Sequence, residues 1–388
     1  MATTTTNYGW DIPQSTDLVK DGATAIATLG QDIDTTFVDL KGGTTGQILS
    51  KASNTDNDYT WISPNPGDIT GVTAGTGLTG GGTSGDVTVS FDVANYGGGQ
   101  YAAGKNKIIN GDFEINQRAF SSTTTNNAYG FDRFKLTYSG GTTTMSAQTF
   151  TAGTAPVAGY EGKNFVRLVS ASQSGTSDYS ACRQSIEDVR NFAGKTVTVS
   201  FWAKASTGTP NIGTTLAQNF GSGGSATVAT SATVQAITTS WARYSFTISV
   251  PSISGKTIGT IDTSLDNWIY ISCGSTISGS GYAAVGIQNV TIDIWGVQVE
   301  AGSVATPFTT ATGTIQGELA SCQRYYFRNS NSAKSYAAMG TLGYVNTTSN
   351  FELFYPLPVT MRTAPTSVDF SNLRVYDYNT SFSVSAAT

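Results

Sequence analysis

The only stretch of this chain with helical periodicity lies near the N-terminus, in residues 16–40. Ile26, Ile33 and Leu40 repeat at steps of seven, with Leu29 between the first two. This is a narrow apolar seam, too thin for a globular core and typical of a short coiled coil. The complete predicted seam is Leu18, Ile26, Leu29, Ile33, Phe37 and Leu40.

The predicted helix carries signals at both of its ends. Thr16 or Asp17 can cap the first turn, and Gly42-Gly43 ends the helix. The sequence leaves a second interpretation of the seam open, in which the helix packs against later domains of its own chain.

Two strand-like runs follow the predicted helix, in residues 46–62. They flank an Asn- and Asp-rich turn at 54–58 and predict a β-hairpin. A lone hairpin is marginal in water and needs a partner. Pro64 and Pro66 separate the hairpin from the next segment.

Residues 67–92 read GDITGVTAGTGLTGGGTSGDVTVSFD and begin and end on the related phrases GDIT and GDVT. The segment has too little apolar surface to fold alone, so we expect it to bury that surface between chains. A flexible linker is the alternative, and the period-two alternation at its end argues against it. The apolar positions are Ile69, Val72, Leu78, Val87, Val89 and Phe91.

From residue 104 to 312 many strand-length runs alternate with turn signals such as Ser-Gly-Gly and Ala-Gly. Their number and spacing predict an antiparallel β-sandwich of the jelly-roll type. Residues 313–388 contain further strand-like sequence and predict a small C-terminal β domain. The fold class is therefore mostly β.

The side-chain phases of three of these strands predict a ligand site. In TVTVSFWAKAS, WARYSFTISV and NWIYISC, one phase is apolar and the other carries a Trp together with a cation or a Tyr. Such rings can stack on sugar faces; alternatively, they fill a second layer beneath loops or against a neighbouring chain. The candidate ligand-binding residues are Trp202, Lys204, Trp241, Arg243, Trp268 and Tyr270.

Composition excludes several classes of function. Of 388 residues 12% are charged and none is histidine, which removes imidazole bases and imidazole metal sites. A net charge of −5 argues against nucleic-acid binding. The three cysteines are widely spaced, so we interpret them as buried small residues. Neither a signal peptide nor a membrane-spanning run is present, which predicts a soluble protein made in a cytoplasm and no membrane insertion.

Catalysis is not expected. A hydrolase without histidine would need two convergent carboxylates, and no acid pair stands out among residues 104–312. The long β-helix repeats of a depolymerase spike are also absent from the sequence.

The segments GTTGQILSKASNTDNDYTWISP and GDITGVTAGTGLTGGGTSGDVTVSFD resemble the shaft modules of bacteriophage tail fibres. The start, NYGWDIPQSTDLVKDGATAIATLGQDID, resembles N-terminal segments of marine phage fibre and appendage proteins. The resemblance implies a homotrimer whose N-terminus docks on a phage tail or adaptor protein. It also implies location in the virion and contact with a glycan or protein of the host surface.

The phrases NKIINGDFEINQR and IDIWGVQVEAGSVATPF resemble the first and last strands of carbohydrate-binding-module-like jelly rolls. In that family a Glu and an Asp in these strands often bind a structural Ca²⁺, and the matching residues in this sequence are Glu114 and Asp293, with Asp112. The last strand has a single Asp where the family has a pair. No cofactor is required otherwise, and the alternative is that these carboxylates bind turn amides.

Together these features predict a phage tail fibre that adheres to the host surface by binding, with glycans as the expected ligand and without catalysis. The alternatives are a purely structural virion fibre of capsid, neck or tail, and a glycan-degrading tailspike. Five segments are expected: 1–41 for anchoring and the trimeric helix, 42–66 for the hairpin, 67–103 for the shaft, 104–312 for the jelly roll, and 313–388 for the tip.

Overall fold

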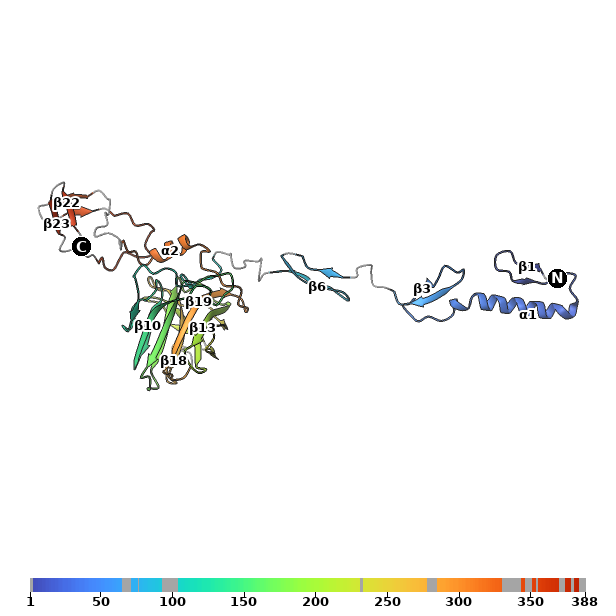
Figure 1. The fold of residues 1–388 in the computed structure, drawn as a ribbon, viewed down its shortest axis with the longest axis horizontal. Helices are drawn as coiled ribbons and strands as arrows, with labels where there is room; N and C mark the ends of the chain where they lie inside the picture. Colours follow the sequence, from blue (N-terminus) through green and yellow to red (C-terminus); the bar gives the residue numbers. More distant parts are fainter. Residues whose placement is uncertain are drawn as a thin grey trace. The chain divides into compact units, whose positions relative to one another are not determined.

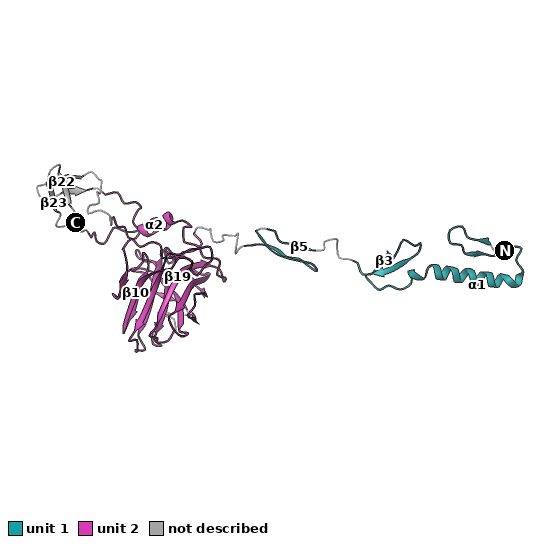
Figure 2. Ribbon diagram, in the orientation of Figure 1, with its two compact units in different colours: residues 1–90 teal, residues 91–388 magenta. Residues whose placement is uncertain are grey.

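The computed structural model describes residues 3–64, 71–75, 77–92, 104–230, 233–277, 285–329, 343–345, 351–353, 355–369, 374–377 and 380–383. The chain divides into two compact units, residues 1–90 (unit 1) and residues 91–388 (unit 2), coloured separately in Figure 2. Each unit is described by itself. The finer division into five segments stays a prediction.

Unit 1 contains the predicted helix as α1 (Val19–Thr36), which is followed by the 3-10 turn η1 (Val38–Leu40). The expected cap is wrong. Leu18 occupies the N-cap position with an extended backbone and no side-chain cap, and the Asp17 carboxylate instead accepts a hydrogen bond from the amide of Gln14, at 2.7 Å. The helix therefore begins after both predicted capping residues.

The helix also ends earlier than the seam requires. Phe37 is the C-cap residue and Leu40 lies in η1, so neither continues the heptad of α1. The Phe37 ring contacts Trp10 of its own chain edge-on, with 5.9 Å between ring centroids. Of the predicted seam, Ile26, Leu29 and Ile33 lie on α1, and Leu18 lies at its cap. Coiled-coil pairing of this shorter seam stays a prediction.

Strands of unit 1 are short and pair with near neighbours. The predicted hairpin is confirmed, with Ile48 opposite Ile62 and Lys51 opposite Tyr59. A separate three-stranded sheet forms in the glycine-rich segment, in the order β5-β6-β7. The strands are β1 (Thr3–Thr4), β2 (Asp11–Ile12), β3 (Ile48–Lys51), β4 (Tyr59–Ile62), β5 (Val72–Thr73), β6 (Leu78–Gly82) and β7 (Val89–Phe91).

Glycines of β6 permit close contact between strands of the same chain. Gly80 and Gly81 have φ values of +104° and +110°, which side chains rarely adopt. A Cβ on Gly80 would lie 2.3 Å from the carbonyl oxygen of Thr88, and one on Gly81 would lie 2.4 Å from that of Val72. These glycines therefore relieve crowding between strands of one chain.

Unit 1 has no core of its own in the part that the structure describes. None of the described residues between 3 and 90 is buried. Apolar side chains are exposed along its whole length, among them Leu18 (62%), Ile26 (65%), Leu78 (45%) and Val89 (39%).

Unit 2 is built on the β-sandwich that the sequence predicts (Figure 1). One sheet, called the β13 sheet, has the order β17-β13-β19-β11-β10-β8. The other, the β18 sheet, has the order β15-β14-β18-β12-β9, with β16 also paired to β14. All strand pairs in both sheets are antiparallel.

The strands of the sandwich have the following bounds. The β13 sheet contains β8 (Ser122–Thr123), β10 (Thr142–Thr149), β11 (Asn164–Ala171), β13 (Thr196–Ala205), β17 (Ala242–Ser249) and β19 (Thr291–Ala301). The β18 sheet contains β9 (Lys135–Ser139), β12 (Tyr179–Ile186), β14 (Asn211–Asn219), β15 (Val228–Ala229), β16 (Thr233–Ala236) and β18 (Ser264–Cys273).

The core lies between the two sheets and follows the predicted alternation. Val199 and Phe201 of β13 pack in one buried cluster with Phe246 of β17 and Ile269 and Ile271 of β18. The same alternation places the polar and Trp-bearing phases of these strands on the outer faces of the sheets. This arrangement positions the candidate site.

The chain after the sandwich departs from the predicted all-β tip. Residues Ile315–Gln323 form a helix, α2, whose N-cap Thr314 accepts a hydrogen bond from the amide of Gly317. Beyond α2 the structure describes two short antiparallel pairs, β20 (Gly343–Val345) with β21 (Phe351–Leu353), and β22 (Arg374–Asp377) with β23 (Thr380–Ser383).

The three cysteines are buried and unpaired with one another, as predicted. Burial raises the pKa of the Cys182 thiol to about 12. Among the described residues no helix is long and apolar enough to cross a membrane.

Candidate functional site

The outer face of the β13 sheet brings together two of the predicted ligand residues. Lys204 of β13 lies across from Asp293 of β19, and Asp293 lies across from Arg167 of β11. Trp241, just before β17, completes the row, with the Lys204 ammonium 5.3 Å from the centroid of its ring. These four residues, Arg167, Lys204, Trp241 and Asp293, are called the outer-face array.

One carboxylate, that of Asp293, contacts both cations of the array. Asp293 accepts a bidentate pair of hydrogen bonds from Arg167, at 2.7 Å from Nε and 2.9 Å from the second guanidinium nitrogen, and Lys204 Nζ lies 3.7 Å from the same carboxylate. The hydrogen bond to Asp293 raises the pKa of Arg167. Asp293 is 4% exposed, whereas the side chains of Arg167 and Lys204 are 36% and 31% exposed. The two cations therefore present donors to solvent above a buried anion.

Trp241 is supported from below by two aromatic rings. Its ring packs edge-on against Phe165, with centroids 5.4 Å apart, and tilted against Phe150, at 5.5 Å. Phe150 and Phe165 are buried, while Trp241 is half-buried. A rigid, partly solvent-exposed indole beside charged hydrogen-bond donors suits amphipathic, hydroxyl-rich ligands.

Trp202 and Arg243 lie on the same outer face of the β13 sheet but are covered by other side chains. Trp202 is 9% exposed and packs at right angles to Phe308, with 6.1 Å between centroids. Arg243 is stacked over the Trp202 ring at 4.7 Å and donates to the hydroxyl of Ser200. The prediction that Trp202 offers a wet platform is wrong, because a loop after the last strand covers it.

A bulge in β19 shapes this covered part of the face. Gly296 has a φ of +66°, and a Cβ there would lie 2.7 Å from the Trp202 ring. The pairing of β13 with β19 shifts between Ser200 and Trp202 at this point. Trp295 shares the outward phase of Asp293 and packs against Trp202, and the bulge shifts the phase after it so that Val297 and Val299 face the core.

The remaining predicted pair lies on the other sheet. Trp268 and Tyr270 of β18 stack nearly parallel, 5.7 Å apart with an interplanar angle of 5°. Arg183 lies 4.8 Å from the centroid of Trp268, and the pair packs in a small cluster that includes Val285. The six predicted residues therefore divide between two opposite faces of the sandwich, since β18 and β13 belong to different sheets.

The three predicted calcium ligands do not come together. Asp293 gives both carboxylate oxygens to Arg167, and Glu114 accepts from the amide of Lys163 at 2.7 Å, as the alternative interpretation expected. Asp112 accepts from the Tyr160 hydroxyl and has its other oxygen buried without a partner among the described residues. Within the described part of the chain, no group of three or more acidic or cysteine side chains could hold a metal ion.

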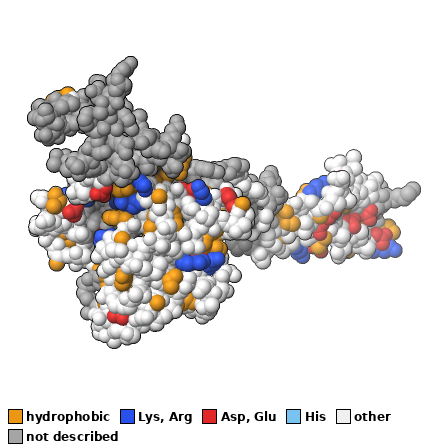
Figure 3. Space-filling view, turned by 60° about the vertical axis from the view of Figure 1, so that its left-hand side comes forward, with side chains coloured by type: hydrophobic (Ala, Val, Ile, Leu, Met, Phe, Trp, Pro, Cys, Tyr) orange, Lys and Arg blue, Asp and Glu red, His pale blue; other side chains and the backbone are white. Residues whose placement is uncertain are grey.

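Figure 3 shows one face of the molecule as mostly polar side chains and backbone, with hydrophobic and charged side chains in small separate groups.

Sequence reasoning missed Arg167, Phe150 and Phe165. Arg167 shares the phase of Phe165 in the run NFVRLVSA, so its position on the outer face was readable from alternation. Its partner Asp293 lies 126 residues away, and no local signal shows that their strands pair.

No family model matches the chain, and no curated protein matches it. Solved structures resemble about half of it. The xylan-binding CBM22-1 domain from Paenibacillus barcinonensis is 13% identical with a TM-score of 0.28, over 52% of this chain and 98% of that one. A family 11 carbohydrate-binding module from Clostridium thermocellum, solved with a mixed-linked tetrasaccharide, is 12% identical with a TM-score of 0.29, over 48% and 98%.

The enzymatically active domain of tailspike protein 4 of bacteriophage CBA120 is 13% identical with a TM-score of 0.31. The match covers 51% of this chain and 22% of that chain, so it spans under a quarter of the tailspike domain. At TM-scores of 0.31 or less, these three likenesses add nothing to the β-sandwich described above.

Proposed function

We propose that this chain is a non-catalytic adhesive fibre protein of the phage tail-fibre kind, in which unit 2 binds surface glycan and unit 1 joins several copies. The observation that carries the proposal is the outer-face array. It sets a half-buried indole on a buried aromatic base, beside two partly exposed cations held by one carboxylate.

The chemistry of the array suits a sugar. The C–H bonds on one face of a pyranose ring carry slight positive charge and lie well on the negative face of an indole. Hydroxyl groups around that ring accept hydrogen bonds from Arg167 and Lys204. Asp293 already fixes both cations, so their side chains lose less entropy when a ligand arrives.

The exposed apolar surface of unit 1 is the basis for the proposed association of several copies of the chain. Its exposed apolar side chains have no core of their own among the described residues, and further copies of the chain are the partners with the matching seam. Copies joined through unit 1 would present several arrays to one surface, so weak contacts would add up by effective concentration. A trimer is the expected assembly, with the start of the chain docked on the phage particle.

Two other functions fit the same fold. A purely structural virion fibre would have the assembly but no ligand at the array, and a glycan-degrading tailspike would release product from its ligand. A test of adsorption blocking by the purified protein separates adhesion from the structural role. A reducing-sugar assay on host polysaccharide separates adhesion from the spike.

The decisive experiment is a binding assay of full-length Trp241→Ala on a panel of immobilised bacterial surface polysaccharides. We expect at least about a tenfold loss of affinity, because a hot-spot aromatic contact is removed. The matched control is Tyr129→Ala, which removes another exposed, cation-flanked ring of the same sandwich. Equal binding by the wild type and Trp241→Ala, or an equal loss in the control, would refute the array as the glycan site.

A further inference from the structure

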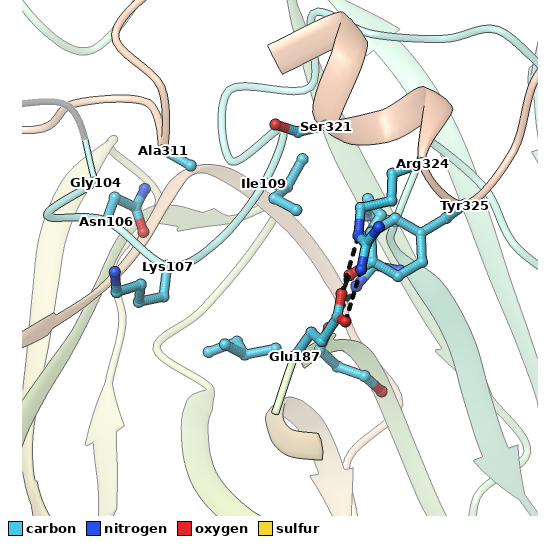
Figure 4. A pocket seen from close by; sticks show the side chains of 12 residues that line it. Gly104, Asn106, Lys107, Ile109, Glu187, Ala311, Ser321, Arg324 and Tyr325 are labelled. Carbon is cyan, nitrogen blue, oxygen red and sulfur yellow. Dashed lines mark hydrogen bonds and ion pairs between the residues drawn. The ribbon is translucent and has the colours of Figure 1, made fainter. Parts of the chain in front are cut away.

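A cavity in unit 2 lies apart from the outer-face array, and none of the four array residues lines it. It has a volume of about 270 Å³. It is lined by residues from 104–109, by the end of β12 with the residue after it, by α2 with the two residues that follow, and by Arg133 and Ala311 (Figure 4). This volume is sufficient for a ligand the size of a single sugar ring.

A buried arginine lines the cavity without a carboxylate partner. Arg133 is 8% exposed, and its guanidinium stacks over the Tyr325 ring at 3.4 Å and donates to the carbonyl of Ser185. Among the described residues, its Nε has no hydrogen-bond partner and no carboxylate lies within 4 Å of its guanidinium. Buried arginines are normally paired with an anion.

A second cation, Lys107, lines the cavity on its other side. Figure 4 shows Lys107 across the cavity from Glu187 and Arg324. No described carboxylate forms an ion pair with Lys107.

The one carboxylate among the described lining residues is already neutralised. Glu187 accepts from Arg324, at 2.9 and 3.2 Å, and from the hydroxyl of Tyr325, at 2.7 Å. Arg362 lies 3.8 Å from the same carboxylate. Lys107, Arg133 and Arg324 therefore outnumber Glu187 in the lining, which leaves the cavity with an excess of positive charge.

We propose that this cavity binds a carboxylated monosaccharide, a hexuronate or a sugar acid of similar size. The carboxylate would lie between Lys107 and the guanidinium of Arg133, whose planar nitrogens suit bidentate recognition. Ile109 and the Tyr325 ring supply apolar wall, and Ser321 supplies a hydroxyl group for the ring hydroxyls of the ligand. The combination of cations, apolar wall and neutral polar groups is that of a site for an acid with a polar ring.

The test is isothermal titration of the full-length protein with glucuronate, with glucose and inorganic phosphate as comparison ligands. We expect saturable binding of glucuronate and none of glucose or phosphate. Lys107→Met should weaken glucuronate at least about tenfold, the loss that follows removal of one charge-assisted hydrogen bond. Lys256→Met, an exposed lysine outside the lining, is the matched control and should bind as the wild type does.

Arg133→Lys keeps the positive charge but loses the planar set of guanidinium donors. We therefore expect weaker glucuronate binding with an unchanged midpoint of thermal unfolding. If it loses fold as well, Lys107→Met alone decides the question. Three results would overturn the proposal: no glucuronate binding, equal binding of glucose or phosphate, or equal loss in Lys107→Met and Lys256→Met. Because Trp241 does not line the cavity, Trp241→Ala should leave glucuronate binding intact, which keeps this proposal separate from the array.

Discussion

Unit 1 and unit 2 differ in how many of their side chains are buried within one chain. In unit 2 strands of up to 11 residues pair into two sheets that enclose a core in which Phe201, Ile271 and Val299 are fully buried. In unit 1 the strands span 2 to 5 residues, and no described residue is buried. Both units are rich in threonine and glycine, so composition alone does not separate them.

The difference lies in how much apolar surface one chain can bring to one place. Sheets that pack face to face pool the apolar phase of many strands, and the cost of ordering the chain is met within one molecule. A lone hairpin and a three-stranded ribbon have only one thin layer each. Unit 1 therefore requires a second surface, and we infer that other copies of the chain supply it.

The largest expected effect is on assembly through α1. Ile26→Asp combined with Ile33→Asp places charges in the predicted seam, and we expect complete loss of the oligomer at micromolar concentration. Thr28→Asp combined with Thr35→Asp adds the same charge two residues on, away from the seam, and should leave the mass unchanged. Analytical ultracentrifugation measures both; oligomers of equal mass in the two variants would remove α1 from the interface.

Next in size is a core substitution in unit 2. Phe201 is fully buried and stacks on Phe246 with 5.5 Å between centroids. Phe201→Ala should lower the free energy of unfolding of the sandwich by about 3–5 kcal/mol, since it leaves a cavity. Urea unfolding followed by tryptophan fluorescence measures the loss. The counterpart Leu78→Ala in unit 1 should not change that transition, and a similar loss there would show that the two units share a core.

The smallest expected effect concerns pH. Burial raises the pKa of the Asp112 carboxyl. The folded state then binds more protons than the unfolded chain between the ordinary carboxyl pKa and the raised one, so stability is lost as pH rises through this window. Asp112→Asn removes the buried charge and still accepts from Tyr160.

We expect Asp112→Asn to be more stable than the wild type at neutral pH, by about 1 kcal/mol, with the difference shrinking as pH falls. Urea midpoints measured between pH 5 and pH 8 test this. Asp86→Asn, at an exposed position of unit 1, should match the wild type throughout. A constant offset across the pH range would contradict the assigned cause.

Alternation along single strands was sufficient to predict which side chains face the core. The apolar phases of residues 196–205 and 242–249 are buried as expected. Strand pairing was not readable, because the contact between Arg167 and Asp293 depends on which distant strands become neighbours. The alternation along a strand also does not show which outward side chains a loop will cover. Trp202 and Trp241 both point outward, but a loop covers Trp202 and leaves Trp241 half-buried.

Helix α2 was missed although a local signal was present. Thr314 is a good N-cap residue, and its hydroxyl does accept from the amide of Gly317. The strand-rich sequence after it outweighed this signal. The cavity was beyond sequence reasoning, since Lys107, Arg133 and Arg324 come to line one cavity only after the sandwich has closed and α2 has packed.

The most direct test of the division of roles between the two units is the native mass, by light scattering, of the full chain and of a copy that lacks residues 1–100. We predict a full-length mass of three times 40.5 kDa, about 122 kDa, and the mass of a single folded chain for the truncated copy. A full-length monomer would show that the exposed seam and ribbon of unit 1 bury nothing between chains. A truncated copy that stays trimeric would place assembly in unit 2 and contradict the division of roles.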